Sequence, residues 1–477
     1  MTARPPGAGD SRAAGAGSAS HGLRADLKPL DVLLLVMGGI IGAGIFFSPH
    51  LVAKEQPSAA GILLTWGLGG LLALTGAFVF AELGALFPRT GGQYVYLRES
   101  CGKSVAFLYG WNLLAMVASG ALAVVAGVAV SNLDIVLRHT LGDPAREFFS
   151  REGRALSGAG LILGCAWLNV RGIRLGATVH NAIMAFKVLS LLLVIVLGIV
   201  WSFRRPEAPP AGFFAAGPRL ESLAPALLAA LFSYGGWQNA ASVAGEIRDA
   251  PRVLPRAIIL GTLLVVGLYL GLNLALLEVL GVEGLSSTQT PVADAAERVL
   301  GRFGHVLVAS MIVLSTVGIA HALILMTPRV YYAMAADGVF FEACGRSHPK
   351  NGTPHVAILV QAAFGLAHYL VATYVTTLGE LLDSLVFVDW VFFALTAASY
   401  FYFRLRRPDA PRPYRATGHP WTPLVFLTLS LGVVVFTLAG VSRRRLLVAG
   451  IVFATGLLLL LFRRRRARHA PEPPPAA

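Results

Sequence analysis

Glycines interrupt two apolar stretches that decide the fold of this chain: VMGGIIGAGIFF (residues 36–47) and LFSYGGW (residues 231–237). Glycine destabilises a helix by about 1 kcal/mol relative to alanine, and lipid offers no partner to a backbone group that leaves a helix. Such interruptions persist where they line a cavity inside a membrane protein. Interrupted helices at matching positions of two halves are typical of a transporter's binding site.

The composition is that of a membrane protein. Apolar residues make up 56% of the 477 residues and charged residues 13%, and the mean hydropathy is +0.68, which excludes an ordinary soluble domain. A membrane-spanning helix needs about 20 apolar residues. Twelve stretches qualify, at 30–54, 61–86, 93–134, 155–172, 178–202, 222–246, 254–281, 304–336, 355–377, 380–403, 421–441 and 445–462. We therefore expect an all-α polytopic membrane protein with 12 transmembrane helices, of which the third and eighth tilt or extend past the membrane.

The basic residues point to a lipid surface. A net charge of +14 raises the question of nucleic acid binding. With twelve spans and a cytoplasmic N-terminus, however, Lys and Arg are in excess on the cytoplasmic side, as the positive-inside rule requires. The arginines at 463–466 would then face anionic lipid of the inner leaflet. We expect no nucleic acid partner, and we expect both termini in the cytoplasm.

The order of the spans predicts two repeats. Residues 28–202 hold spans one to five, residues 222–403 hold spans six to ten, and residues 421–462 add two spans. An odd number of spans makes the second repeat cross in the opposite sense, which is the inverted-repeat arrangement of several transporter folds. We expect residues 1–27 to be a disordered cytoplasmic tail and residues 463–477 to be a basic, Pro-rich cytoplasmic tail.

The sequence gives no sign of catalysis. Cys101, Cys165 and Cys344 lie far apart, so neither metal-ligand spacing nor a disulfide framework is visible. The segment Gly42-Ala43-Gly44 resembles part of a dinucleotide-binding fingerprint, but the third glycine, the preceding strand and the ribose-binding acid are missing. We expect no catalytic residue, no metal and no cofactor. A membrane-embedded enzyme would show clustered His, Asp or Ser at one membrane face, and a non-transporting sensor would add a signalling domain.

The two breaks suit the two charges of an amino acid. After residues 42–44 a new half-helix begins, and its free N–H groups favour an anion such as a carboxylate. Before Gly235 a half-helix ends, and the carbonyls near Phe232 and Gly235 are free to accept hydrogen bonds from an ammonium group. A zwitterion with both charges on one carbon matches such a pair. The alternative is that these glycines only allow helices to pack closely.

Four motifs resemble one known family. GGIIGAGIFFSP (38–49), FSYGGWQNAASVAGEIRDAPRVLPRAI (232–258), GGQYVYLRE (91–99) and STVGIAHALILMTPRVYYAMAADG (315–338) are similar to the amino acid–polyamine–organocation superfamily, in particular to L-type amino acid transporters and their bacterial relatives. The resemblance extends over residues 28–440. It implies a LeuT-like 5+5 inverted repeat with spans 1 and 6 unwound. It also implies alternating-access transport of amino acids, with neutral ones expected, as exchanger or proton symporter. A polyamine or cationic amino acid permease is the alternative.

The resemblance also implies a substrate site formed by the two breaks and the residues beside them. These residues are Ile40, Gly42, Ala43, Gly44, Phe232, Gly235, Gly236, Trp237 and Gln238. The carboxylate would bind at Ala43 and Gly44, and the amino group at the carbonyls of Ile40, Phe232 and Gly235. Phe232 resembles the gate that closes over substrate, and the two residues at 237–238 would shape the side-chain pocket.

Three ionisable residues inside spans are candidates for coupling. Lys187 is an intramembrane cation, which is a functional hypothesis by default, with snorkelling as the alternative. The resemblance implies that its ammonium group replaces the sodium ion of sodium-coupled cousins by bonding carbonyls of span one. Glu246 either holds the second half-helix or transfers protons, unless it is a structural acid near Arg248. His321 is either a pocket or proton-handling residue or an interhelical hydrogen-bonding group. Glu82 is expected to be structural.

This chain departs from the family at two positions and lacks a cysteine that some relatives have. Many relatives have Ser where this chain has Ala43, so one hydroxyl donor is missing, and relatives often have Asn at the position of His321. The light subunits among eukaryotic relatives bond to a glycoprotein partner through a cysteine in the loop after span three. Residues 135–154 contain no cysteine. We therefore expect no disulfide-linked partner subunit and a bacterial inner-membrane location.

Overall fold

The structure is a computed structural model of the chain. It describes residues 23–141, 149–204, 217–375, 378–440 and 443–468. Most of the expected N-terminal tail, parts of the loops at 135–154 and 203–221, and the end of the expected C-terminal tail lie outside these residues.

All regular elements in the described part of the chain are helices, which confirms the expected all-α class. They are α1 (Pro29–Ile40), α2 (Gly44–Glu55), α3 (Ala59–Leu86), α4 (Gln93–Cys101), α5 (Lys103–Asn112), η1 (Leu113–Val117), α6 (Ala118–Leu141), α8 (Arg151–Val170), α9 (Ile173–Arg204), η2 (Leu220–Ser222), α10 (Leu223–Tyr234), η3 (Trp237–Glu246), α11 (Ala250–Ser287), α12 (Pro291–Leu300), α13 (Arg302–Met326), α14 (Pro328–Ala336), η4 (Glu342–Gly345), α15 (His355–Tyr374), α16 (Leu378–Arg406), α17 (Trp421–Gly440) and α18 (Arg443–Arg468). An isolated backbone bridge joins Leu27 to Ile247.

The lengths and composition of these helices are those of a polytopic membrane protein. Among the described residues, seven helices are long and apolar enough to cross a membrane, and α1 with α2 makes an eighth if this pair, bent by 45°, counts as one span. Described helices overlap each of the twelve expected stretches. The count of twelve crossings and the inverted repeat stay predictions.

The third expected span, residues 93–134, begins differently from the expectation. Gly102 has a positive φ of 85° and separates α4 from α5. A positive φ is a conformation that glycine adopts readily and that ends a helix. The apolar helix that can cross a membrane therefore runs from Lys103 to Leu141, and α4 is a separate short helix before it.

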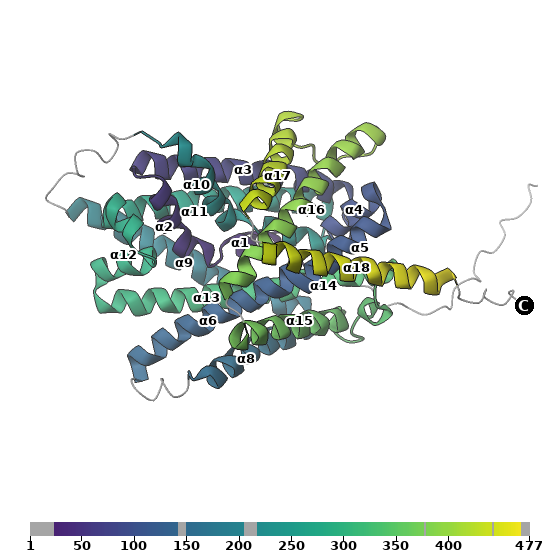
Figure 1. Cartoon of the computed structure of the whole chain (residues 1–477), viewed down its shortest axis with the longest axis horizontal. Coiled ribbons are helices and arrows are strands. Elements are labelled where there is room, and N and C mark those ends of the chain that lie inside the picture. The colour runs from purple at the N-terminus through teal and green to yellow at the C-terminus, as the bar shows by residue number, and fades with distance from the viewer. Residues whose placement is uncertain (1–22, 142–148, 205–216, 376–377, 441–442, 469–477) are drawn as a thin grey trace, which may run out of the picture.

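The helices pack side by side around α1 (Figure 1). In that view α3, α10 and α11 lie together along one edge of the molecule, whereas α6, α8 and α15 lie together along the opposite edge. α1 contacts α9, α11 and α13 between these groups. The end of α1, where the first broken segment is interrupted, therefore lies inside the helical assembly.

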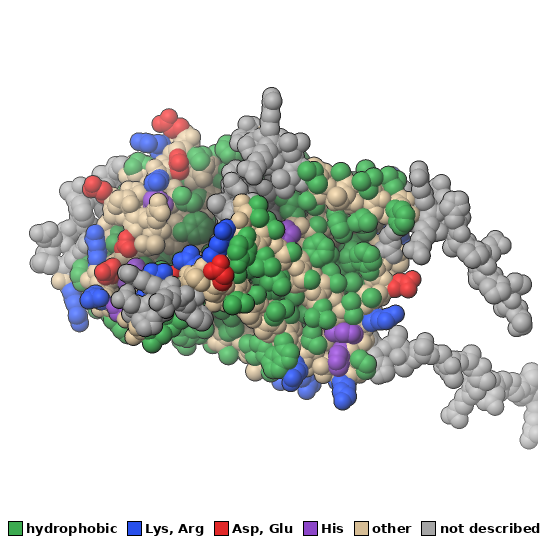
Figure 2. Space-filling view, turned by 60° about the horizontal axis from the view of Figure 1, so that its bottom comes forward, with side chains coloured by type: hydrophobic (Ala, Val, Ile, Leu, Met, Phe, Trp, Pro, Cys, Tyr) green, Lys and Arg blue, Asp and Glu red, His purple; other side chains and the backbone are tan. Residues whose placement is uncertain are grey.

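Apolar side chains cover much of the surface. Hydrophobic side chains occupy a broad part of the face shown in Figure 2, where few charged groups interrupt them. Trp167 on α8 and Leu189 on α9 are 55% and 66% exposed. Exposed apolar area of this extent is rare on soluble monomers and fits contact with lipid.

Candidate functional site

The first break lies between α1 and α2, and its carbonyls receive hydrogen bonds from distant side chains. α1 ends at Ile40 and α2 begins at Gly44. The Tyr269 hydroxyl of α11 donates to the Ile40 carbonyl at 3.2 Å, and the Lys187 ammonium of α9 donates to the Ile41 carbonyl at 3.0 Å. Two carbonyls that the unwinding removes from the helical pattern are thus satisfied by other helices, as burial requires.

The amides on the other side of the first break have no such partners in the part of the chain that the structure describes. The first N–H groups of a helix lack an intrahelical acceptor, and α2 begins with Gly44 after Ala43. The hydrogen bonds of the described residues include none from the N–H of Ala43 or Gly44. The start of α2 therefore presents free donors together with the positive end of a helix dipole, which suits an anion.

The second break lies between α10 and η3 and is held by its own residues. α10 ends at Tyr234, Gly235 is extended with φ −69° and ψ 157°, and Gly236 is left-handed with φ 114°. The chain then continues as a 3-10 helix rather than an α-helix. The side-chain oxygen of Gln238 accepts a hydrogen bond from the Gly236 amide at 3.0 Å. Gln238 therefore bonds to the backbone of the break itself.

Glycines bring the two breaks into contact. A Cβ atom at Gly39 would lie 2.6 Å from the carbonyl oxygen of Gly236, and a Cβ at Gly236 would overlap the carbonyl of Gly39. A Cβ at Gly44 would lie 2.9 Å from the hydroxyl oxygen of Ser233. The glycines at the two breaks therefore allow close backbone packing at the same positions where the helices unwind. By contrast, Gly38 serves packing, because a Cβ there would overlap the ring of His180.

The two aromatic residues of the second motif occupy different surroundings. Phe232 is 39% exposed, and its ring centroid lies 5.9 Å from that of Phe47 on α2. Trp237 is 3% exposed and packs at 5.0 Å against Phe80 and at 5.8 Å against Phe393. Phe232 thus stands at an open edge beside the breaks, whereas Trp237 anchors η3 in an aromatic cluster.

The ammonium group of Lys187 points into the protein. Lys187 is 3% exposed, and besides its bond to Ile41 it packs against Gly318 of α13, where a Cβ would lie 3.1 Å from the nitrogen. This placement differs from snorkelling, in which the nitrogen reaches the membrane surface. Lys187 joins three helices, α9, α1 and α13, next to the first break.

His321 makes interhelical contacts. Its Nε2 lies 2.8 Å from the carbonyl of Gly176 on α9, and its Nδ1 lies 3.2 Å from the amide nitrogen of Asn169 on α8. Its ring stacks on that of His180, with centroids 6.2 Å apart and an interplanar angle of 19°. His180 in turn lies 3.1 Å from the carbonyl of Leu34 in α1. The two histidines therefore connect α13 to α1 through α9.

Glu246 forms a buried ion pair at the end of η3. Both oxygens bind the guanidinium of Arg329 on α14, at 2.7 and 3.2 Å. The two side chains are 0% and 1% exposed, and Arg248 is not the partner. Removing one member of a buried pair typically destabilises a protein by about 3–5 kcal/mol. The backbone carbonyl of Glu246 also accepts a hydrogen bond from Leu27 at 3.0 Å.

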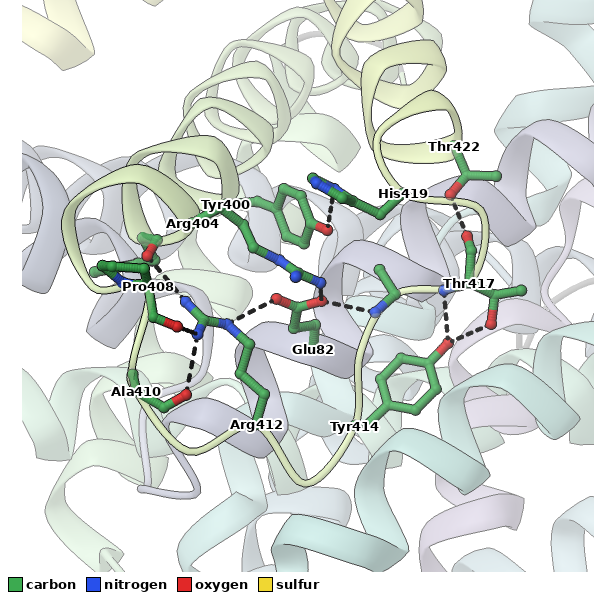
Figure 3. Close-up of polar contacts among 12 residues, drawn as sticks. Glu82, Tyr400, Arg404, Pro408, Ala410, Arg412, Tyr414, Thr417, His419 and Thr422 are labelled. Atoms are coloured by element: carbon green, nitrogen blue, oxygen red, sulfur yellow. Dashed lines mark hydrogen bonds and ion pairs between the residues drawn. The ribbon is translucent and has the colours of Figure 1, made fainter.

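Glu82, near the end of α3, fastens the segment between α16 and α17 (Figure 3). Its carboxylate lies 2.6 Å from Arg404, 3.3 Å from Arg412 and 2.6 Å from the Ala416 amide. The residue is 2% exposed, so three donors compensate a buried charge. These contacts are those of a structural acid that holds residues 407–420 against α3.

Three residues beside the breaks have no role of their own in the expectations from sequence: Tyr269, Ser233 and His180. His180 lies two turns before Lys187 on α9, so helical spacing from the lysine marks both side chains as facing α1. Ser233 lies inside the glycine motif itself. Tyr269 carries no comparable signal, because nothing local tells which distant hydroxyl reaches a given carbonyl.

Comparison with known proteins places the chain in a family. A family model described as amino acid permease matches residues 27–462. The serine/threonine exchanger SteT of Bacillus subtilis is 29% identical, over 88% of this chain and 92% of the exchanger. The human large neutral amino acids transporter small subunit 2 is 28% identical, over 91% and 80%, and the human Asc-type amino acid transporter 1 is 28% identical, over 82% and 74%. These relatives are transporters, not enzymes. The chain belongs to the amino acid permease family.

Proposed function

We propose that this protein moves amino acids across the membrane by alternating access, with the substrate bound between the two helix breaks. One observation carries the proposal: Gly44, at the start of α2, lies against Ser233, at the end of α10. Free amides and the end of a second half-helix therefore lie side by side. The printed names of the relatives, which are amino acid exchangers and transporters, support the same substrate class.

The proposed site binds the two charges separately. The amides of Ala43 and Gly44 would receive the carboxylate, since the start of α2 favours an anion. The amino group would bind the carbonyls of Phe232, Gly235 and Ile40. Gly42 and Gly236 keep the backbone unwound, whereas the residues at 237–238 position the second break. No metal or cofactor is part of this mechanism.

The proposed organisation follows the sequence. Twelve spans would cross a bacterial inner membrane. Spans one to ten would form two inverted repeats, 28–202 and 222–403, and residues 421–462 would add two spans. Both tails would lie in the cytoplasm. Lys187, Glu246 and His321 would take part in coupling. Exchange and proton symport are both compatible with these residues, and the exchanger among the relatives favours exchange.

The conformation supports a state that is closed on one side. Near the start of α1, Leu27 pairs with the backbone of η3, and Asp26 lies 3.0 Å from Arg174. On the side of α2 and α10, Phe232 stays 39% exposed. Contacts thus close the α1 end, whereas the aromatic residue proposed as the gate remains uncovered at the other.

Uptake by proteoliposomes tests the proposal. Radiolabelled L-serine, L-threonine and L-leucine are offered to vesicles that are empty or preloaded with the same amino acid, with and without a pH gradient. Gly44→Val should abolish uptake without loss of membrane insertion, because its side chain would fill the junction at Ser233. Gly164→Val is the matched control, since a Cβ there meets open space on α8. Normal uptake by Gly44→Val would remove the proposed carboxylate site.

A further inference from the structure

The hydroxyl of Ser233, at the end of α10, has no hydrogen-bond partner among the described residues, and the residue is only 2% exposed. Hydroxyls within the helices of this chain commonly bond the carbonyl one turn earlier, as Thr65 and Thr262 do at 2.8 Å. Ser233 does not make this bond. A buried hydroxyl without a partner is destabilising, and a hydrogen-bonding ligand would remove this cost.

This hydroxyl is aimed at the first break. A Cβ built on Gly44 would lie 2.9 Å from the Ser233 hydroxyl oxygen and 3.2 Å from the Ser233 Cα. Gly44 is the first residue of α2, a helix of 12 residues, and the amides there make no hydrogen bond within the described chain. An unbonded hydroxyl from one half of the sequence and unbonded amides from the other therefore converge on one place.

We propose that Ser233 is a substrate-binding residue whose hydroxyl donates a hydrogen bond to the substrate carboxylate at the start of α2. This assignment rests on the proposed function and names a donor that the sequence analysis lacked. A hydroxyl can donate or accept, and the positive end of α2 selects the anionic carboxylate over the ammonium group as the group bound there. The Ala43 side chain supplies no donor, so the hydroxyl comes from the second break.

The consequence is that one charged group of the substrate bridges both breaks. Backbone amides of α2 hold the carboxylate from one side, and the hydroxyl of α10 holds it from the other. Binding of the carboxylate then joins the two half-helices, and a ligand without a carboxylate joins them less well. Phe232 is adjacent, with its ring 3.4 Å from the Cβ position of Gly44, so the gate proposed at this residue lies next to the bridge.

Ser233→Ala tests the assignment in proteoliposomes, with Ser310→Ala as the matched control. The Ser310 hydroxyl bonds the carbonyl of Val306 in its own helix at 2.9 Å. For L-serine uptake, Ser233→Ala should raise KM about tenfold with little change in the maximal rate, which is the loss expected for one hydrogen bond to a charged group. Ser233→Cys, which keeps a weak donor, should give an intermediate KM. Ser310→Ala should leave KM unchanged.

Two further measurements separate binding from a structural role. Competition by L-serinamide, which lacks the carboxylate, should be affected less, so the preference for L-serine over the amide should shrink by about the same factor. Without substrate, Ser233→Ala should melt at an equal or higher temperature than the wild type, because an unbonded buried hydroxyl is gone. With saturating L-serine, its gain in melting temperature should be smaller than that of the wild type.

The results distinguish the two proposals. If the wild type takes up none of the amino acids offered, the proposed function fails. If the wild type transports L-serine and Gly44→Val blocks uptake, but Ser233→Ala has the KM of Ser310→Ala, only the Ser233 assignment is overturned. An unchanged preference for L-serine over L-serinamide in Ser233→Ala overturns it as well.

Discussion

The two helix breaks solve the same problem in different ways. At the first break, side chains from other helices bond the freed carbonyls: Lys187 bonds Ile41 and Tyr269 bonds Ile40. At the second break, the geometry is local, because Gly236 adopts a left-handed conformation and Gln238 bonds its amide. A break held by distant partners depends on the packing of the whole molecule. A break held by its own residues depends on a few adjacent positions.

This difference predicts where each break is vulnerable. The second break should fail when the backbone at one glycine can no longer adopt its conformation. The first break should fail gradually as donors on α9 and α11 are removed one at a time. Substitutions at Gly236, Lys187 and Phe232 separate these behaviours.

Gly236→Ala should have the largest effect. Alanine is strained at a φ of 114°, and its Cβ would overlap the carbonyl of Gly39. Displacement of the two breaks by about 1 Å would reduce transport on the order of 100-fold. Gly235→Ala is the neighbouring control, because its φ is −69° and the nearest atom to its Cβ, the Phe232 carbonyl oxygen, lies 3.7 Å away. Uptake per inserted protein is the measurement, and equal losses for both variants would contradict local control of this break.

Lys187→Ala should have the second largest effect. It leaves the Ile41 carbonyl buried without its donor, which costs about 1–3 kcal/mol, so we expect about a tenfold loss of uptake. If the ammonium group takes part in proton coupling, the pH profile of uptake also flattens. Tyr269→Phe is the control at the same break, because it removes the donor to Ile40 without removing a cationic group. Its pH profile should stay parallel to that of the wild type, and a parallel profile for Lys187→Ala would leave the lysine a structural role only.

The features that could be predicted from the sequence are those that depend on a short run of neighbouring residues. The helical class, the membrane location and the ends of α1 and α10 follow from apolar runs and from the glycines at 38–44 and 235–236. Those signals are local because glycine acts on its own backbone. The expected span at 93–134 was wrong at its start, because Gly102 ends α4 through a positive φ that composition alone does not show.

Partners across the fold could not be predicted. The acid Glu246 was placed beside Arg248 in sequence, yet Arg329 binds it. His321 stacks on His180, and these two rings meet only because α9 packs against α13. Ser233 lies within a glycine motif in the sequence, and only the packing of α2 against α10 brings its hydroxyl to the first break. Each of these contacts depends on how helices distant in sequence pack.

Phe232→Ala should have the smallest of the three effects and shows to which break the gate belongs. The rings of Phe232 and Phe47 lie 5.9 Å apart, a contact worth about 1 kcal/mol, so we expect about a fivefold loss of uptake with unchanged protein abundance. Phe47→Ala removes the same contact but leaves the ring on α10 in place. If Phe232 is the gate, Phe47→Ala loses less uptake than Phe232→Ala, because the ring on α10 can still cover the substrate. A greater loss in Phe47→Ala would assign closure to α2, and then the first break would hold the substrate carboxylate and also carry the group that shuts over it.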